Sequence, residues 1–242
     1  MAKERLDKII SSQLNMTRSE AKTAIKKGLV LVDAKVISDC AYKADPTAQQ
    51  ISFDGKELGY SKYVYIMMNK PKGVISSTQA RNFPSVIDIL PDEMKRKGLF
   101  PAGRLDKDTT GFMLITDDGD FAHDILAPKK HVQKTYTAVL DKPAGDELIE
   151  EFKKGIVLDD ETAFQSAVLE IADDRRICRV IINEGKYHQI KRMFAHFSLT
   201  VVELNRDKIG NLSLDPALAP GECRYIDEKE LELISKNRTV TP

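Results

Sequence analysis

The spacing of hydrophobic residues along this chain predicts different elements in its first 60 residues and in the remainder. Apolar residues within 6–14 and again within 21–25 lie three or four apart, which is the spacing of an amphipathic helix. Residues 17–20 have the form of a capping box that would begin the second helix, and Gly28 stands where a helix commonly ends. Short apolar runs within 29–37 then predict a small hairpin.

The remainder of the chain mixes short apolar runs with longer amphipathic segments. These patterns predict, in order, a strand over 63–68, a short helix at 86–90, a strand over 112–116, a helix over 119–126, a strand over 134–140, a helix over 142–155, then strand, strand, helix and strand within 164–209, a loop over 206–221 and a charged, solvated helix over 227–236. The polar stretch at 54–60 predicts a linker between the two parts.

The formal charge of the chain is balanced, with 37 Lys plus Arg against 37 Asp plus Glu. A neutral chain can bind a polyanion only through local concentrations of positive charge. Arg18, Lys22 and Lys26 form such a concentration, because their spacing places them on one face of the second predicted helix. The 242 residues, 42% of them hydrophobic, are enough for one large domain or two smaller ones.

The cysteines and the N-terminal residues indicate in which cellular compartment the protein is expected. Cys40, Cys178 and Cys223 are far apart and form no Cys-x-x-Cys pair, so the sequence predicts neither a disulfide framework nor a zinc knuckle. Reduced thiols suit the cytosol. Residues 3–8 are charged, unlike the apolar core of a signal peptide, and no apolar run approaches the roughly 20 residues of a membrane helix. We therefore expect a cytoplasmic protein without membrane contact.

Residues 103–111 form an unusual charged loop directly before the strand predicted at 112–116. The loop reads Gly-Arg-Leu-Asp-Lys-Asp-Thr-Thr-Gly, with one glycine at each end. Glycine permits backbone conformations that other residues resist, and loops that a rigid scaffold positions commonly carry reactive groups. We therefore expect the chemistry of this protein to be centred on this loop.

Four motifs, found in this order, resemble those of the pseudouridine synthases, and in particular of the RsuA branch, which acts on ribosomal RNA. The motifs are the loop at 103–111, Lys-Thr-Tyr at 134–136, Glu-Gly-Lys-Tyr-His-Gln-Ile-Lys-Arg-Met at 184–193, and Ile-Gly-Asn-Leu-Ser-Leu-Asp at 209–215 followed by Leu-Ala-Pro-Gly-Glu at 218–222. Lys-Pro-Lys-Gly at 70–73 is similar to the sequence that opens the catalytic domain of this family. The last motif is more similar to the small-subunit members than to their large-subunit relatives.

The N-terminal part resembles the S4 RNA-binding module. The similarity covers about residues 3–55 and rests on Arg-Leu-Asp-Lys at 5–8, Thr-Arg-Ser at 17–19 and Gly-Leu-Val-Leu-Val-Asp at 28–33. Together the resemblances imply an α+β protein. They imply an S4 (α-L) module over 1–58, a linker over 59–62, a catalytic domain over 63–236 with a mixed, mostly antiparallel sheet and flanking helices, and a C-terminal tail over 237–242.

The resemblance also implies roles for individual residues. Asp106 would be the catalytic nucleophile, Lys191 its cationic partner, Tyr136 a ring that stacks under the target uracil and a candidate proton acceptor, and Arg104 a side chain that helps to fill the space left by a flipped base. A partly buried carboxylate such as that of Asp106 is costly without a cationic partner. The expected RNA-binding residues are Arg5, Lys8, Arg18, Lys22, Lys26, Lys186, His188 and Arg192.

The implied activity is the isomerisation of one uridine in small-subunit (16S) rRNA to pseudouridine, by base flipping and a covalent Asp106 intermediate. This reaction needs no cofactor and no metal, and we expect none; the expected partner is rRNA, free or in an assembling small subunit, and the expected state is a monomer. Whether Asp106 attacks the sugar or the uracil ring is left open by the sequence.

Four alternatives stay open at this point. The chain could be a large-subunit rRNA synthase of the same family, or a non-catalytic S4-type RNA-binding or ribosome-assembly protein. A glycosidase would use Asp106 with Asp108 or Asp117, and a metal site could be built from Asp106, Asp108, Asp117, Asp118 and Asp120.

Overall fold

The computed structural model describes residues 3–79, 82–127 and 132–235. Contacts divide the chain into two compact units, one of residues 1–64 with 91–99 and one of residues 65–90 with 100–242. The segment 91–99 thus groups with the N-terminal unit, although it follows the first strand of the second unit in sequence. Position 236 and the expected tail at 237–242 lie outside the described residues.

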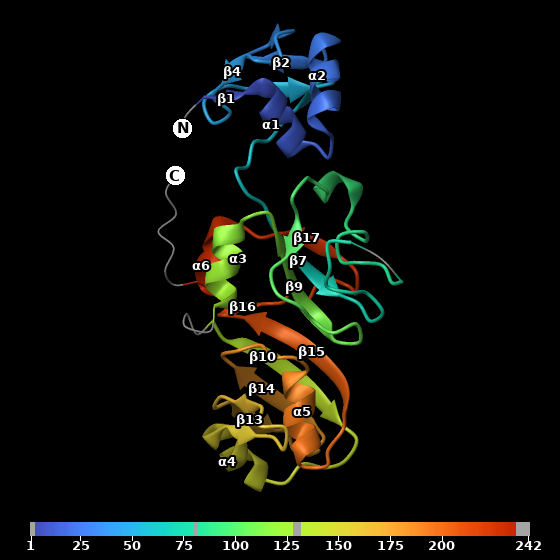
Figure 1. The fold of residues 1–242 in the computed structure, drawn as a ribbon, viewed down its shortest axis with the longest axis vertical. Helices are drawn as coiled ribbons and strands as arrows, with labels where there is room; N and C mark the ends of the chain where they lie inside the picture. Colours follow the sequence, from blue (N-terminus) through green and yellow to red (C-terminus); the bar gives the residue numbers. More distant parts are fainter. Residues whose placement is uncertain (1–2, 80–81, 128–131, 236–242) are drawn as a thin grey trace. The chain divides into compact units, whose positions relative to one another are not determined.

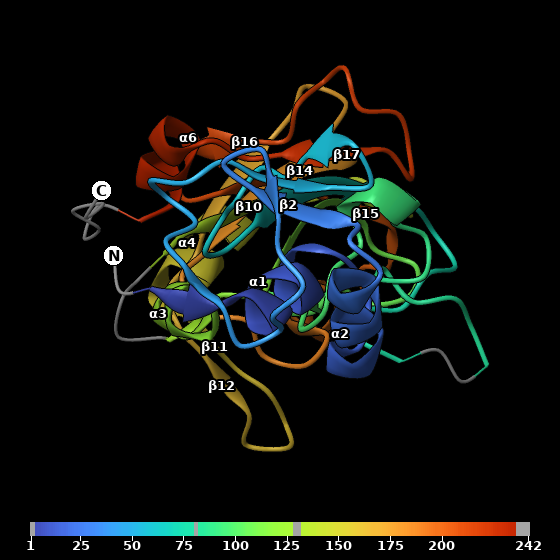
Figure 2. The ribbon, with the colours of Figure 1, turned by 90° about the horizontal axis from the view of Figure 1, so that it is seen from above.

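The N-terminal unit pairs two helices with short strands, and Figures 1 and 2 show α1 and α2 side by side. Its elements are β1 (Glu4–Arg5), α1 (Leu6–Gln13), α2 (Arg18–Lys26), β2 (Val30–Val32), β3 (Lys35–Val36), β4 (Lys43–Ala44), β5 (Ile51–Phe53), β6 (Lys56–Glu57) and the 3-10 turn η1 (Asp92–Met94). Strands β3, β2, β5 and β6 form an antiparallel sheet in this order, and β1 pairs with β4.

The two N-terminal helices and the hairpin are confirmed. The capping box is complete, because the Thr17 hydroxyl accepts from the Glu20 amide at 3.2 Å and the Glu20 carboxylate accepts from the Thr17 amide at 2.6 Å. Gly28 follows the helix end with φ +74°, a conformation that glycine adopts without strain. The apolar faces of both helices are buried together with β2 in one core.

Asp7 is a buried carboxylate in this unit that sequence periodicity did not reveal. The Arg5 guanidinium donates two hydrogen bonds to it, at 3.1 and 2.9 Å, and Arg18 lies 3.5 Å away. The hydrogen bonds from Arg5 lower the pKa of Asp7 despite its burial. Arg5 and Arg18, both expected to bind RNA, are therefore also tied to the protein, while they remain exposed to solvent.

We expect Asp7→Asn to destabilise the N-terminal unit by about 1–3 kcal/mol near neutral pH, the usual effect of losing hydrogen bonds to a charged group. Because the folded pKa is lowered, this contribution is present above the unfolded pKa of about 3.9 and is lost as pH falls through the folded pKa. Urea unfolding followed by hydrogen exchange in α1 should show a difference between variant and wild type that shrinks toward acid pH. Asp54→Asn, at an exposed turn of the same unit, is the control; an equal effect of both variants would contradict the prediction.

The second unit is built on one large mixed sheet. Its elements are β7 (Tyr65–Lys70), β8 (Phe100–Pro101), β9 (Thr110–Thr116), α3 (Gly119–Leu126), β10 (Lys134–Leu140), α4 (Glu147–Lys154), β11 (Ile156–Val157), β12 (Ala163–Phe164), β13 (Val168–Ile171), β14 (Ile177–Ile182), α5 (Gln189–His196), β15 (Val201–Ile209), β16 (Leu212–Ser213), β17 (Cys223–Tyr225) and α6 (Glu228–Ile234).

The main sheet has the order β13-β14-β10-β15-β9-β7-β17, with β16 on β15 and β8 on β9. The β15–β9 pairing is parallel and the other pairings within it are antiparallel, so the predicted mixed, mostly antiparallel sheet is confirmed. Helices flank it (Figure 1). Helices α3 and α6 pack with Met67, Phe112 and Leu114 in one core, and α5 contacts α4 through the rings of Phe194 and Phe152, whose centroids are 5.0 Å apart.

Tertiary contacts change four local predictions. The helix expected at 142–155 begins only at Glu147, because Arg175 binds the Ala144 carbonyl and the Asp146 carboxylate and holds the preceding residues in a turn. Residues 86–90 form a turn instead of a helix, closed by reciprocal bonds between Ser85 and Asp88.

The other two changes lie near the C-terminus. The loop expected from 206 is strand up to Ile209, because Arg206 is buried in β15 and donates to the Phe112 carbonyl at 2.7 Å. Helix α6 is not fully solvated, since Leu231 and Ile234 lie in the core of the second unit. Within the described residues, no helix is long and apolar enough to cross a membrane.

Candidate active site

The loop that carries Asp106 is braced by the segment that follows β7. The Ser76 hydroxyl donates to the Leu105 carbonyl at 2.8 Å and accepts from the Leu105 amide at 2.9 Å. The Gly73 amide donates to the Lys107 carbonyl at 2.9 Å. Two chain segments that are about 30 residues apart in sequence therefore hold each other in one conformation.

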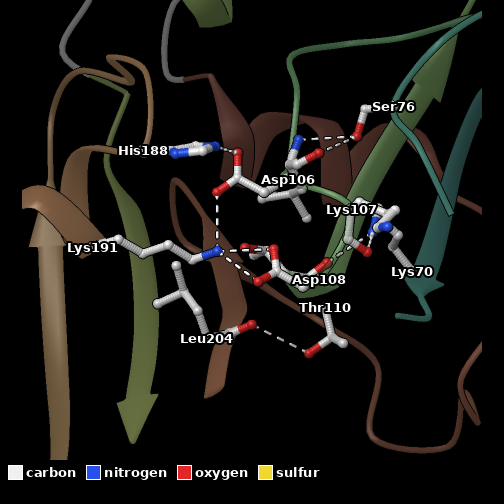
Figure 3. Close-up of polar contacts among 11 residues, drawn as sticks. Lys70, Ser76, Asp106, Lys107, Asp108, Thr110, His188, Lys191 and Leu204 are labelled. Atoms are coloured by element: carbon white, nitrogen blue, oxygen red, sulfur yellow. Dashed lines mark hydrogen bonds and ion pairs between the residues drawn. The ribbon is translucent and has the colours of Figure 1, made fainter. Parts of the chain in front are cut away.

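Lys70, at the end of β7, is the buried anchor of this arrangement. Its side chain has no exposed surface, and its ammonium donates to the carbonyls of Thr109 at 2.8 Å, Pro71 at 3.1 Å and Lys107 at 3.3 Å. Burial lowers the pKa of Lys70 to about 8, and the charges of Asp108 and Asp106 oppose this shift. The ammonium thus joins the segment after β7 to the part of the loop that follows Asp106 (Figure 3).

The pairings of the sheet place Lys70 and Tyr136 in register across four neighbouring strands. Lys70 pairs with Gly111 of β9, Gly111 pairs with Arg206 of β15, and Arg206 pairs with Tyr136 of β10. Gly111 has φ +97°, and a Cβ there would lie 2.4 Å from the Arg206 carbonyl oxygen. Only glycine fits this close parallel pairing, which places the loop beside β15, the neighbour of the strand that carries Tyr136.

Asp106 lies between two side chains from the N-terminal end of α5 (Figure 3). His188 Nε2 is 3.4 Å from Asp106 Oδ1, and Lys191 Nζ is 3.4 Å from Asp106 Oδ2. The shorter contacts of Lys191 are to Asp108, at 2.8 and 2.9 Å, and they lower the pKa of Asp108. The expected neighbours Asp106 and Lys191 are therefore together, but Lys191 is shared by two carboxylates.

A pocket opens beside Asp106 and brings together all four residues expected to be catalytic, because Arg104, Tyr136 and Lys191 also line it. Its full lining is Arg104, Leu105, Asp106, Thr109, Tyr136, Ile182, Gly185, Lys186, His188, Gln189, Ile190, Lys191 and Leu204. Tyr136 is buried, whereas Arg104 is exposed. A carboxylate, three cationic side chains and an aromatic ring thus converge on a partly enclosed space, which the Asp106 loop, β10, β14, β15, α5 and the residues just before α5 delimit.

The residues expected to bind RNA are in different situations. In the N-terminal unit Lys22 and Lys26 are exposed, and Lys8 is exposed but pairs with Glu4 at 2.8 Å. In the second unit Lys186 donates to the Ala163 carbonyl, and Arg192 pairs with Asp160 at 2.5 Å. His188, also expected to bind RNA, lies 3.4 Å from the Asp106 carboxylate.

Sequence reasoning missed Lys70 and Ser76 as members of the site, and it considered Asp108 only for a glycosidase or a metal site. Lys70 stands in a Lys-Pro-Lys-Gly turn and Asp108 in a charged loop, and such positions are usually solvated. The available signal for Lys70 was a lysine at the end of an otherwise apolar strand. Nothing in the local pattern marks Ser76, whose partner is 29 residues away.

The contacts disfavour two of the alternatives. Within the described ranges, no group of three or more His, Cys, Asp or Glu side chains is arranged to hold a metal ion. Asp118 instead caps α3 by accepting from the Phe121 amide at 3.0 Å, and it accepts from the Tyr65 hydroxyl at 2.6 Å. Asp108 is poorly suited as the general acid of a glycosidase, because Lys191 lowers its pKa.

We expect Lys70→Met to destabilise the strands around the site, because three carbonyls lose their shared donor. In the folded protein the pKa of Lys70 is about 8, below the ordinary value of 10.5. Between these two pH values Lys70 is protonated mainly in the unfolded chain. The free energy of unfolding of the wild type therefore rises with pH over this range. The variant should lack this rise, so the stability difference between wild type and variant should grow from neutral to alkaline pH.

Urea unfolding followed by hydrogen exchange in β7 and β9 measures this difference. Lys72→Met is the matched control, because the Lys72 side chain is about half-exposed. In the described part of the chain its ammonium contacts Glu203, at 3.3 Å. A difference between wild type and Lys70→Met that stays constant from neutral to alkaline pH would contradict the lowered pKa of the buried Lys70 ammonium.

Comparisons with known proteins identify the family. Residues 64–196 match the family model described as RNA pseudouridylate synthase, and residues 4–49 match the S4 domain.

The chain is 41% identical to the uncharacterized RNA pseudouridine synthase YtzG of Bacillus subtilis, over 96% of this chain and 98% of that protein. It is 42% identical to ribosomal small subunit pseudouridine synthase A of Escherichia coli K12, over 94% and 98%. A solved structure titled as a pseudouridylate synthase matches with a TM-score of 0.67 and 36% identity, covering 95% of this chain and 99% of that one. The chain belongs to the RNA pseudouridine synthases, which are isomerases, and carries an S4 RNA-binding domain.

Proposed function

We propose that this protein isomerises one uridine of small-subunit (16S) rRNA to pseudouridine, with Asp106 as the nucleophile. The observation that carries the proposal is the position of the Asp106 carboxylate, which lies at a pocket with Tyr136 and within 3.4 Å of both His188 and Lys191. The 42% identity to a synthase named for the small subunit, over 94% of the chain, supports the choice of rRNA.

The reaction breaks the bond between C1′ of the ribose and N1 of the uracil and forms a bond between C1′ and C5. An ionised carboxylate can hold one of the two parts covalently while the base turns. If Asp106 attacks C1′, uracil leaves with the electron pair of the C–N bond, C5 then attacks C1′ and displaces the carboxylate, and the C5 proton is lost. If Asp106 instead adds to C6 of the uracil, the carboxylate holds the base while the C1′–N1 bond breaks and C5 bonds to C1′. Loss of the C5 proton and of the carboxylate then restores the C5–C6 double bond, and in either route N1 takes up a proton. Both routes release the hydrogen of C5 and need no cofactor.

The other pocket residues have distinct proposed roles. Lys191 fixes the two carboxylates of the loop, and the buried Tyr136 ring lies under the uracil and can accept the C5 proton. Arg104 is exposed at the pocket, where its planar guanidinium can stack in the space that the flipped base leaves. Flipping costs a few kcal/mol and is cheapest in unpaired RNA, which favours a loop or an irregular helix as target.

The S4 domain would supply binding that is largely independent of sequence. Arg5, Lys8, Arg18, Lys22 and Lys26 are exposed cations of this domain, and such groups contact phosphates. The substrate would be the rRNA itself or a partly assembled small subunit. We propose that the protein acts as a monomer in the cytoplasm, in keeping with its free cysteines.

The test of the nucleophile is tritium release from small-subunit rRNA transcribed with 5-tritiated uridine. We expect the wild type to release about one tritium per rRNA and Asp106→Asn to release none, because an amide cannot replace the carboxylate. Asp120→Asn, in the exposed first turn of α3, is the control and should release the wild-type amount. Asp106→Asn should still bind the rRNA.

Full release by Asp106→Asn would overturn the mechanism. Release from large-subunit rRNA alone would move the substrate to that RNA. If the wild type released nothing from either rRNA or from partly assembled subunits, a role in binding or assembly without catalysis would replace the proposal.

The test of the S4 surface is the dependence of rRNA affinity on salt. Replacing Lys22 and Lys26 by Ala should reduce the slope of log K against log salt by about 1.4 to 1.8, since each lost phosphate contact contributes about 0.7 in single strands and 0.9 in duplex. Replacing Lys153 and Lys154 of α4 by Ala removes two exposed lysines that pair with Glu150 and Glu151, and should leave the slope unchanged. Equal slopes for both double variants would contradict phosphate binding by α2.

A further inference from the structure

An exposed aromatic ring stands beside the pocket. The Tyr187 side chain is 70% exposed, unlike the buried ring of Tyr136, and nothing in the proposed chemistry uses it. One face of the Tyr187 ring stacks on the His188 imidazole, with 3.8 Å between ring centroids and 18° between ring planes. A tyrosine that is held against one partner and is largely exposed elsewhere offers a flat surface to a ligand.

The loop that carries Tyr187 is held by hydrogen bonds of Glu184 and Gln189. The buried Glu184 carboxylate accepts from the Gln165 amide at 2.8 Å and from the Gln189 side chain at 2.9 Å. The Gln189 side chain in turn accepts from the Lys186 amide at 3.1 Å. None of these bonds uses the Tyr187 side chain, so the loop conformation does not depend on the ring.

His188 ties this ring to the reacting group. Its backbone is left-handed, with φ 49° and ψ 32°, a conformation that is strained for a residue other than glycine. This conformation places the imidazole against Tyr187 on one side and within 3.4 Å of the Asp106 carboxylate on the other. Strain of this kind persists where the surrounding structure enforces it, commonly at functional sites.

We propose that Tyr187 is a stacking site for an unpaired nucleobase that neighbours the target uridine. The inference rests on the proposed function. A uridine that turns into the pocket leaves its neighbours without a stacking partner, and the ring one residue from His188 is placed to replace it. Bases stack on aromatic side chains largely regardless of their identity, so the site would add affinity and fix the register of the strand.

The first experiment uses the absence of tryptophan from this chain. Tyr187→Trp in the full-length Asp106→Asn background introduces a single indole, and stacking of a base on it should quench its fluorescence when small-subunit rRNA is added. Tyr225→Trp, at a 49% exposed position of β17, is the matched control and should show little quenching. Equal quenching at both positions, or none at position 187 in a complex that forms, would overturn the proposal.

The second experiment separates stacking from a structural role. In tritium-release assays Tyr187→Ala should raise KM by about fivefold to 150-fold, which corresponds to about 1–3 kcal/mol for one stacked base, with a much smaller change in kcat. Tyr187→Phe keeps the ring and should restore wild-type behaviour. A loss confined to kcat, or a failure of Phe to rescue, would contradict stacking on a base.

A third experiment identifies the base. An oligoribonucleotide that spans the modified uridine is made with an abasic residue on its 5′ or its 3′ side. One of these two abasic residues should weaken the binding of the oligoribonucleotide to the Asp106→Asn protein. The same abasic residue should not change the affinity of a protein that carries both Asp106→Asn and Tyr187→Ala. If both abasic residues weaken the two proteins equally, the ring does not contact a neighbouring base and a different partner for Tyr187 replaces the proposal.

The outcomes for the two proposals are distinct. Absence of tritium release by wild type refutes the isomerisation, whatever the fluorescence shows. Normal release together with additive effects of the abasic residue and Tyr187→Ala refutes only the stacking site.

Discussion

The position of the Asp106 carboxylate depends on a buried ammonium group, that of Lys70. This group has left water entirely, which lowers its pKa to about 8, and it is retained because carbonyls of Pro71, Lys107 and Thr109 converge on it. Without the ammonium those carbonyls would need other donors, and the loop would keep only the bonds from Ser76 and Gly73 to hold it on the segment after β7. The buried cation therefore ties the backbone after β7 to the loop that carries Asp106.

The sheet extends this constraint to the rest of the pocket. The pairing of Lys70 with Gly111, of Gly111 with Arg206 and of Arg206 with Tyr136 puts the loop and the tyrosine in a fixed register. The middle step is the parallel one, and it needs a glycine because a Cβ would meet the neighbouring backbone. The groups at the pocket come from segments up to 100 residues apart in sequence, from Arg104 to Leu204, so the site exists only when the sheet is complete.

Sequence reasoning succeeded where structure is determined locally or where a motif carries the information. The capping box at Thr17 and Glu20 and the strand at 134–140 depend on neighbouring residues, and the proximity of Lys191 to Asp106 followed from the motif resemblance. It failed where a polar residue is buried by a distant partner. Arg206 and Lys70 have the polarity of loop residues, and only the completed sheet provides the carbonyls that allow their burial.

The sharing of Lys191 between two carboxylates suits the proposed chemistry. A nucleophile that is held by short hydrogen bonds is stabilised in its ground state and must break those bonds to attack. Lys191 lies 2.8 Å from Asp108 but 3.4 Å from Asp106, so the tighter bonds are made to the carboxylate that has no covalent role. Asp108 thereby holds the ammonium in place, and Asp106 remains near a positive charge while its oxygen atoms are only weakly engaged.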